Sequence, residues 1–265
     1  MPATAHFWMS LLAALIYASS ALWGHRLDAK RSKVLIFASW LIHGLVFMLG
    51  LYDEAGLPKF GFAPALSAMS WLVILIYMLE NHWYPQFKTR WILLGLASLT
   101  VMLAAFYPGK ALSAQSSIWL PLHWMLGIAA YGLFAAAVFH GWLLQRAEQL
   151  LRMAEPNDET PPLLTLERLT FRLVLVGFVL LTLTLLVGIG FGEVLYGSDF
   201  SLRPDHKTIF SFLSWFTFAY LLWGRFRLGW RGHKAIRVLY LGSGLLLLAY
   251  VGSRFVLEVL LGRMA

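Results

Sequence analysis

The sequence predicts an all-α polytopic membrane protein, and three observations support this class. Of the 265 residues, 60% are hydrophobic and only 13% are Asp, Glu, Lys or Arg. The mean hydropathy of the chain is +0.70. Runs without charge recur along the sequence, and each is close to the roughly 20 residues that a helix needs to cross a bilayer. Helices are therefore the expected spanning elements, because they satisfy their own backbone hydrogen bonds.

Eight transmembrane helices are expected in all. The second span lies at 34–52, where His43 is the one ionisable interior residue, and the fifth lies within 120–144. Pro121 should stand in the first turn of the fifth helix, where a missing N–H costs little. The eighth span runs from 238 to about 260. The other five are charge-free runs at 7–24, 60–79, 91–107, 173–192 and 208–224.

The distribution of Lys and Arg predicts the orientation of the chain. Short cytoplasmic loops retain basic residues, and alternate loops differ strongly in this respect. Fifteen of the 21 Lys and Arg residues fall on one side of the expected membrane, so both termini are expected on the outer, periplasmic side. The six on the outer side are Lys59, Lys110, Arg203, Lys207, Arg254 and Arg263.

The formal net charge of +8 is explained by this topology. A nucleic-acid partner is not expected, because the basic residues are not grouped on a soluble face. The protein is expected to be a multi-pass protein of the bacterial inner membrane, in contact with the lipid bilayer. The longest connection, at about 145–169 on the inner side, is polar and is expected to be a flexible linker.

The chain contains no cysteine. This excludes disulfides, thiolate metal sites and covalent attachment of haem to this chain. A metal or macrocycle would have to use His, Met or a carboxylate. The segment 111–144 carries no charged side chain but contains His123 near its start. A polar ring is costly in hydrocarbon, so His123 is a functional candidate.

Motifs in the second half of the chain resemble a known family. His123 opens its helix as Leu122-His123-Trp124-Met125, and later motifs read Ser214-Trp215-Phe216 and Gly229-Trp230-Arg231-Gly232. From Pro121 onward, the chain resembles the cytochrome c assembly family, the CcsA-like membrane proteins that handle haem, and within it the HemX/YpjD-type branch. The resemblance implies haem binding and a link to cytochrome c biogenesis.

The chain also departs from the pattern of that family. The segment 190–204 contains no tryptophan, although the corresponding outer loop of the family is rich in it. Trp223 occupies the place of a transmembrane His in the family's synthases, and the outer His expected near the last helix is missing around Arg254. Only His123 transfers directly from the family motif. Cytochrome c synthesis itself is therefore not expected of this chain.

The depth of the histidines suggests which of them meet haem iron, since imidazole is a common axial ligand. His123 and His206 each open a helix at the outer face, so they are expected at similar depth and are the predicted iron ligands. His43 lies nine residues before Tyr52, roughly 13 Å further inward at 1.5 Å per residue.

Each of the other assignments has an alternative. His43 is either a cofactor ligand at a second, deeper site or a hydrogen-bonding residue between helices. His206 is either the second axial ligand or a solvated loop residue beside Asp205. Arg254 and Glu258 are spaced to form an ion pair within one helix, and Arg254 alternatively faces a haem propionate.

Together these features predict a single transmembrane cytochrome c assembly-like domain over residues 1–265. It would bind or pass haem b non-covalently, with other cytochrome c maturation proteins as partners, and a role in haem handling is favoured over an enzymatic one because no catalytic motif is present. The alternative is a non-haem membrane scaffold that keeps the family fold without the cofactor. A small-solute transporter is not supported, because the spans carry few charges.

Overall fold

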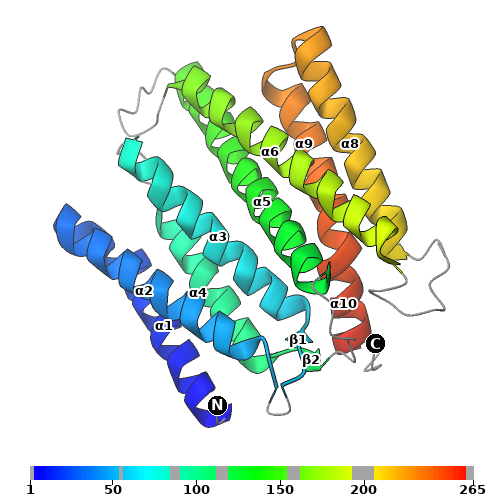
Figure 1. Cartoon of the computed structure of the whole chain (residues 1–265). Coiled ribbons are helices and arrows are strands. Elements are labelled where there is room, and N and C mark those ends of the chain that lie inside the picture. The colour runs from blue at the N-terminus through cyan, green and yellow to red at the C-terminus, as the bar shows by residue number, and fades with distance from the viewer. Residues whose placement is uncertain are drawn as a thin grey trace. The chain divides into compact units, whose positions relative to one another are not determined.

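The computed structural model describes residues 3–53, 56–83, 90–111, 119–153, 162–192 and 206–260, which are almost entirely helical (Figure 1). The all-α class is confirmed. Contacts between Cα atoms divide the chain into two compact units, which we call unit 1 (Met1–Ala114) and unit 2 (Gln115–Ala265).

Unit 1 contains four long helices and one small two-stranded sheet. The side chain of Asp28 caps the second helix by accepting a 2.7 Å hydrogen bond from the Arg31 backbone N–H. Lys59 pairs with Ala111, and Phe60 with Lys110, in an antiparallel two-stranded sheet. The elements are α1 (Ala3–Trp23), a 3₁₀ turn (Gly24–Arg26), α2 (Ala29–Gly50), β1 (Lys59–Phe60), α3 (Phe62–Trp83), α4 (Arg90–Phe106) and β2 (Lys110–Ala111).

Helix α1 packs against α2 and α4, and α3 packs against α4. Two tryptophans join α2 to α3. The indole N–H of Trp40 donates to the Trp71 carbonyl at 3.2 Å, the indole N–H of Trp71 donates to the Trp40 carbonyl at 2.9 Å, and the rings stack 4.8 Å apart. Gly44 leaves the space that the Trp71 ring fills. Polar groups thus pair across helices where no water competes, as buried N–H donors require.

Unit 2 is a bundle of four helical segments. The last one changes winding near its end, because two π-helical turns, Leu248–Gly252 and Val256–Leu260, flank the short α10 (Ser253–Phe255). The other elements are α5 (Trp119–Arg152), α6 (Leu163–Gly190), α8 (His206–Leu228) and α9 (Gly232–Leu247).

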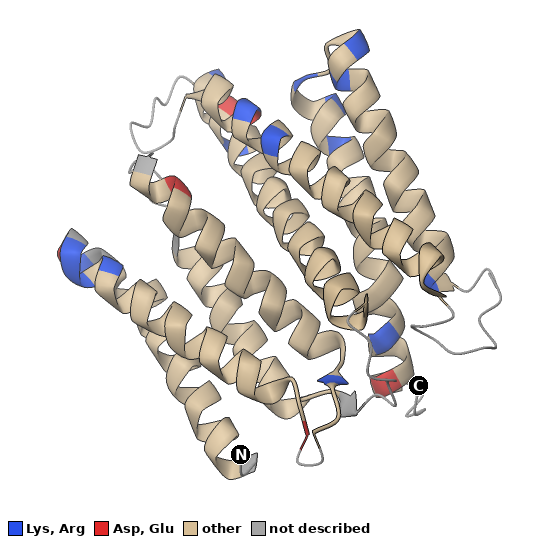
Figure 2. Cartoon of the chain, in the orientation of Figure 1, with Lys and Arg blue, Asp and Glu red and all other residues tan. Residues whose placement is uncertain are grey.

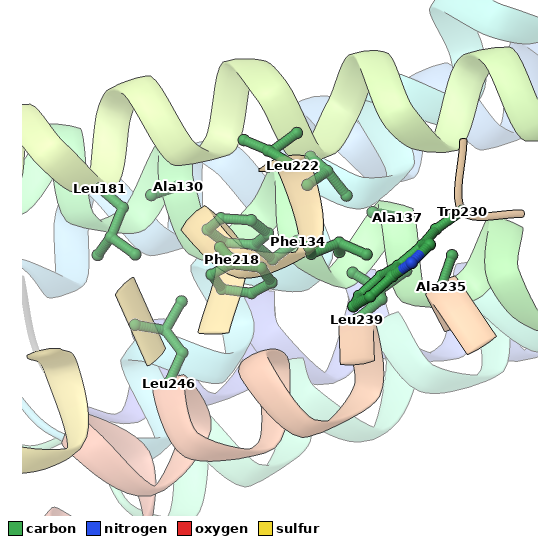
Figure 3. Close-up of a cluster of buried hydrophobic side chains, with 12 residues drawn as sticks. Ala130, Phe134, Ala137, Leu181, Phe218, Leu222, Trp230, Ala235, Leu239 and Leu246 are labelled. Carbon is green, nitrogen blue, oxygen red and sulfur yellow. The ribbon is translucent and has the colours of Figure 1, made fainter. Parts of the chain in front are cut away.

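The core of unit 2 lies among α5, α6, α8 and α9 (Figure 3). Phe134 of α5 and Phe218 of α8 stack with ring centroids 3.8 Å apart and planes within 4°. Two glycines admit these rings, Gly177 beside Phe134 and Gly242 beside Phe218. Small residues therefore let the helices approach closely in a bundle whose outer faces are themselves apolar.

Six helical segments in the described part of the chain are long and apolar enough to cross a membrane. They are the first three helices, α5, α6 and the continuous segment Gly232–Leu260. Helix α4 is a shorter apolar helix of 17 residues, and α8 carries Arg225 and Arg227 in its last turn. The multi-pass membrane class is confirmed. All eight expected spans coincide with helical segments, while a count of eight crossings stays a prediction.

Basic side chains gather at one end of unit 2, where α5 ends, α6 begins and α8 turns into α9 (Figure 2). We call this the basic end. At the turn, Gly229 and Gly232 have positive φ angles of 63° and 55°. Glu167 of α6 forms ion pairs with Arg225 and, at 3.4 Å, with Arg231.

The prediction of a flexible linker at 145–169 was wrong over most of its length. Helix α5 continues to Arg152, and α6 already begins at Leu163. The reason is tertiary packing at the basic end, where Ala147 and Leu166 are buried and Tyr240 donates a 3.1 Å hydrogen bond to Gln145. The middle of the predicted linker, 154–161, lies outside the described residues.

Candidate functional site at the end of unit 2 opposite the basic end

Helices α5 and α6 are antiparallel and pair residue by residue toward the end of unit 2 that lies opposite the basic end (Figure 1). His123 occupies the middle of three successive layers. A Cβ atom placed on Gly188 would lie 3.2 Å from Cε1 of the His123 ring. The outermost layer is an aromatic pair, whose ring centroids lie 3.6 Å apart with planes within 11°. From the interior outward the layers are Gly127 with Thr184, His123 with Gly188, and Trp119 with Phe191.

The His123 ring is half-buried, and its Nδ1 atom is enclosed without a hydrogen-bond partner among the described residues. The ring lies near the backbone of Thr184. Buried side-chain nitrogens are normally hydrogen-bonded, so an unpaired one needs an explanation. Nδ1 is therefore open to a ligand, while the rest of the ring is held by its contacts with Gly188 and with the backbone of Thr184.

His206 is the exposed first residue of α8. Its level in the bundle follows from the contacts of α8 with α6. The indole N–H of Trp215 donates a 2.9 Å hydrogen bond to the Thr182 hydroxyl, and the Trp215 ring lies 5.4 Å from that of Phe178. Continuing this antiparallel pairing back along α8 places His206 level with about Phe191. His206 is thus within about one helical turn of the level of His123, as the sequence suggested.

His43 is in unit 1 and has a different environment. It is 1% exposed. Its Nε2 atom is 2.8 Å from the Ser67 hydroxyl, and its Nδ1 atom is 3.4 Å from the Tyr17 hydroxyl. The structure therefore shows the interhelical hydrogen bonds expected if His43 joins helices. Both of its nitrogens are occupied, so a ligand could reach them only after these bonds broke.

A small cavity in unit 1, with a volume of about 30 Å³, borders Ser67, His6 and Lys59. This is room for one or two water molecules and not for a macrocycle. No cluster of three or more His, Cys, Asp or Glu side chains that could hold a metal ion occurs in the part of the chain that the structure describes. A single axial ligand, as in haem, does not need such a cluster.

Sequence reasoning missed the partners that distinguish these histidines. Gly188 shapes the surroundings of His123, while Tyr17 and Ser67 hold His43. The pairs are separated by 24 to 65 positions along the chain, so no local pattern could reveal them. The loop from Glu193 to Asp205, expected to take the place of the family's outer loop, lies outside the described residues.

The architecture defines a polytopic helical membrane protein with a histidine at the mouth of a charge-free helix. The family profile described as cytochrome C assembly protein matches residues 4–261. The chain belongs to this cytochrome c assembly family, as the motifs around His123 indicated. Membership supports a role in cytochrome c biogenesis.

Individual relatives agree with this assignment. The Escherichia coli inner membrane protein YpjD is 31% identical over 177 residues, which cover 64% of this chain and 66% of that protein. The cytochrome c biogenesis protein CcsA of Prochlorococcus marinus is 22% identical over 286 residues, covering 93% and 89% of the two chains. The match to YpjD thus spans just under two thirds of that relative. No solved structure matches.

Proposed function

We propose that this protein binds haem b non-covalently at the end of unit 2 opposite the basic end, with His123 as an axial ligand, and holds or passes it during cytochrome c assembly. The observation that carries the proposal is the enclosed Nδ1 atom of His123, which has no hydrogen-bond partner within the described residues. The resemblance to CcsA-like proteins that handle haem supports haem as the proposed cofactor.

The surroundings of His123 fit one axial ligand. Imidazole nitrogen binds haem iron directly, and Gly188 leaves the ring space that a larger side chain would take. The stacked rings of Trp119 and Phe191 cover the same end of the helix pair. Flat aromatic surfaces suit an apolar macrocycle. Haem, when bound, would supply redox-active iron and the cargo itself; the chain would orient it and limit its contact with water.

His206 is the proposed second ligand, because it lies near the same level from the α8 side. It is exposed and is therefore able to move toward iron without breaking a buried contact. His43 is proposed as a structural residue in preference to a second haem site, because both of its nitrogens already bond within the core of unit 1.

The proposed location is the bacterial inner membrane. The positive-inside rule would then place the basic end in the cytoplasm, with both termini and His123 on the periplasmic side. Haem would bind on the side where cytochromes c are assembled. Other cytochrome c maturation proteins are the proposed partners, consistent with the name of the CcsA relative.

A second candidate function is a non-haem scaffold that keeps the fold. It is favoured by the absence of tryptophan from 190–204 and by Trp223 at the position where the family's synthases carry a histidine. In that case the unpaired nitrogen of His123 would serve only helix packing, and the protein would act as an accessory to another membrane complex.

Absorption spectroscopy of the detergent-purified protein separates the two functions. The wild type supplied with haem should show a Soret band, and His123→Ala should reduce it at least about tenfold, because the variant loses a direct iron ligand.

His233→Ala is the matched control. His233 is an exposed histidine at the basic end, 3.1 Å from Glu148. The His233→Ala variant should keep the full Soret band. No band in the wild type, or equal losses in the two variants, would favour the scaffold.

A further inference from the structure

The last helical segment of unit 2 contains two buried charged side chains, Arg254 and Glu258, which are 11% and 9% exposed. They lie in a segment that is long and apolar enough to cross a membrane. Charged side chains in such segments are costly, and they usually mark a binding or transport site.

Arg254 makes few of the contacts that a buried guanidinium requires. Its Nη1 atom is 4.0 Å from Oε1 of Glu258, which is too long for a hydrogen bond. Its Cζ atom is 5.9 Å from the Tyr250 ring centroid, at the limit of a cation–π contact. Its Nε atom is buried without a partner in the described part of the chain. The Nε–H donor of Arg254 is thus left for another acceptor, and the separation of Nη1 from Glu258 is too long for a hydrogen bond.

Arg225, at the basic end, shows how this fold satisfies an arginine that only stabilises it. Its Nη1 atom bonds to the Glu167 carboxylate and, at 3.1 Å, to the Trp230 carbonyl. Its Cζ atom lies 4.4 Å over the Phe171 ring. The two arginines are 21% and 11% exposed. Arg254 is therefore more deeply buried than Arg225 and has weaker partners.

The level of Arg254 in the bundle follows from the pairing of α5 with α9. The Tyr131 hydroxyl donates a 2.5 Å hydrogen bond to the Leu246 carbonyl. The helices are antiparallel, since Gly141 further along α5 meets Ile236 earlier along α9. Eight residues outward from each member of the Tyr131–Leu246 pair, about 12 Å along a helix, lie His123 on α5 and Arg254 on the other segment.

The winding of the chain changes on both sides of Arg254. The π-helical turns Leu248–Gly252 and Val256–Leu260 place one extra residue in each turn around it. Such π-helical turns redirect side chains and occur often at functional sites. The Ser253 hydroxyl donates back to the Ala249 and Tyr250 carbonyls, each at 3.0 Å, which supports the altered winding.

We propose that Arg254 binds a carboxylate of the ligand held by His123, namely a haem propionate. The inference rests on the proposed function and adds the group that orients the macrocycle. A guanidinium pairs with a carboxylate through two parallel hydrogen bonds, and its planar fork sets the carboxylate's orientation. With iron fixed at His123 and one propionate at Arg254, the macrocycle would have one rotational setting about the iron–nitrogen bond.

The test compares the affinity for haem with that for haem dimethyl ester, in which both carboxylates are blocked. Arg254→Gln should weaken haem binding about tenfold or more, the loss expected for a charge-assisted hydrogen bond. It should leave the affinity for the ester unchanged. Arg237→Gln, at an exposed arginine of the same helical segment, should change neither affinity.

Two further measurements, thermal unfolding without haem and thermal stabilisation by phosphatidylglycerol, make the outcome decisive. Thermal unfolding without haem, with Arg254→Lys as a variant that retains the charge, shows whether a loss of binding reflects a loss of folding.

Equal affinity of wild type and Arg254→Gln for haem, or equal losses for haem and its ester, would overturn the assignment of Arg254. Thermal stabilisation by phosphatidylglycerol that Arg254→Gln abolishes, with haem affinity unchanged, would assign the arginine to a lipid phosphate and also overturn it. Absence of binding by the wild type to either ligand would instead overturn the proposed function.

Discussion

His43 in unit 1 and His123 in unit 2 both lie in apolar helices, yet their environments differ in kind. His43 is fully buried, and the Tyr17 and Ser67 hydroxyls approach its two nitrogens. His123 is half-buried, and its Nδ1 atom has no partner within the described residues. The first histidine connects three helices. The second borders a glycine and an aromatic pair near the end of two helices.

This difference shows that a histidine in a membrane span does not by itself indicate a cofactor site. A polar ring in hydrocarbon needs hydrogen-bond partners, and in unit 1 the protein provides both. A histidine ring with an unpaired nitrogen can bind a ligand through that nitrogen. The number of hydrogen bonds already made therefore distinguishes the two residues better than their depth.

The largest effect should be on the stability of unit 1. His43→Ala leaves the Tyr17 and Ser67 hydroxyls without their partner and opens a cavity, so it should lower the free energy of unfolding by about 2–4 kcal/mol. His123→Ala should lower it by less than about 1 kcal/mol, because no hydrogen bond of Nδ1 is lost. Reversible unfolding in mixed detergent micelles would measure both values.

The same pair of variants should show the opposite order in haem binding. Per mole of folded protein, His43→Ala should keep the Soret band that His123→Ala loses. A band lost in His43→Ala with stability unchanged would mean that His43 is a ligand, and the comparison between the two histidines would fail.

A smaller effect is expected at the glycine beside His123. In Gly188→Leu the new side chain meets the His123 ring, since even a Cβ atom would lie 3.2 Å from its Cε1 atom. Displacing the ring should weaken haem binding about tenfold. Gly190→Leu is the matched control, two residues away on α6 with nothing within 4 Å of its Cβ position. Equal affinities in the two variants would show that the setting of the ring does not matter.

The smallest effect on affinity is expected from His206→Ala. If His206 is the second axial ligand, its loss should leave haem bound through His123 but convert the spectrum to the pentacoordinate, high-spin form. Added imidazole should restore the six-coordinate spectrum, because a free ligand fills the vacated position. A spectrum unaltered by His206→Ala would mean that another group, or none, lies opposite His123.

Much of the fold could be predicted from local sequence. Long apolar runs, most of them free of charge, identified all eight helical segments, because the length of a span and the cost of charge in lipid are properties of each segment alone. The family was recognised from short motifs around His123, Trp215 and Trp230. The last turns of α5 and the first turns of α6 were not predicted, because these segments pack against distant residues, as where Tyr240 donates to Gln145 of α5.

The candidate site was predicted only in part for a related reason. His123 was identified by its place in a charge-free segment, and its similar level to His206 was inferred from where each helix begins. The side chains that face these histidines could not be predicted from the sequence, since helix packing brings Gly188 to His123 from 65 positions away. The difference between the partners of Arg225 and Arg254 was equally hidden. Arg225 meets the Glu167 carboxylate from 58 positions away, whereas Arg254 is 4.0 Å from Glu258, four residues along its own helix.

The sequence by itself thus determined the solvent of this protein, its helical segments and its family, and it made His123 a candidate ligand. These follow from hydrophobicity and residue type, which act over one turn or one span. Only the tertiary structure decided that His43 is held on both sides while His123 and Arg254 keep unused hydrogen-bonding capacity. The physical reason is that satisfaction of a buried polar group depends on which other helix lies against it, and that contact joins residues far apart in the chain.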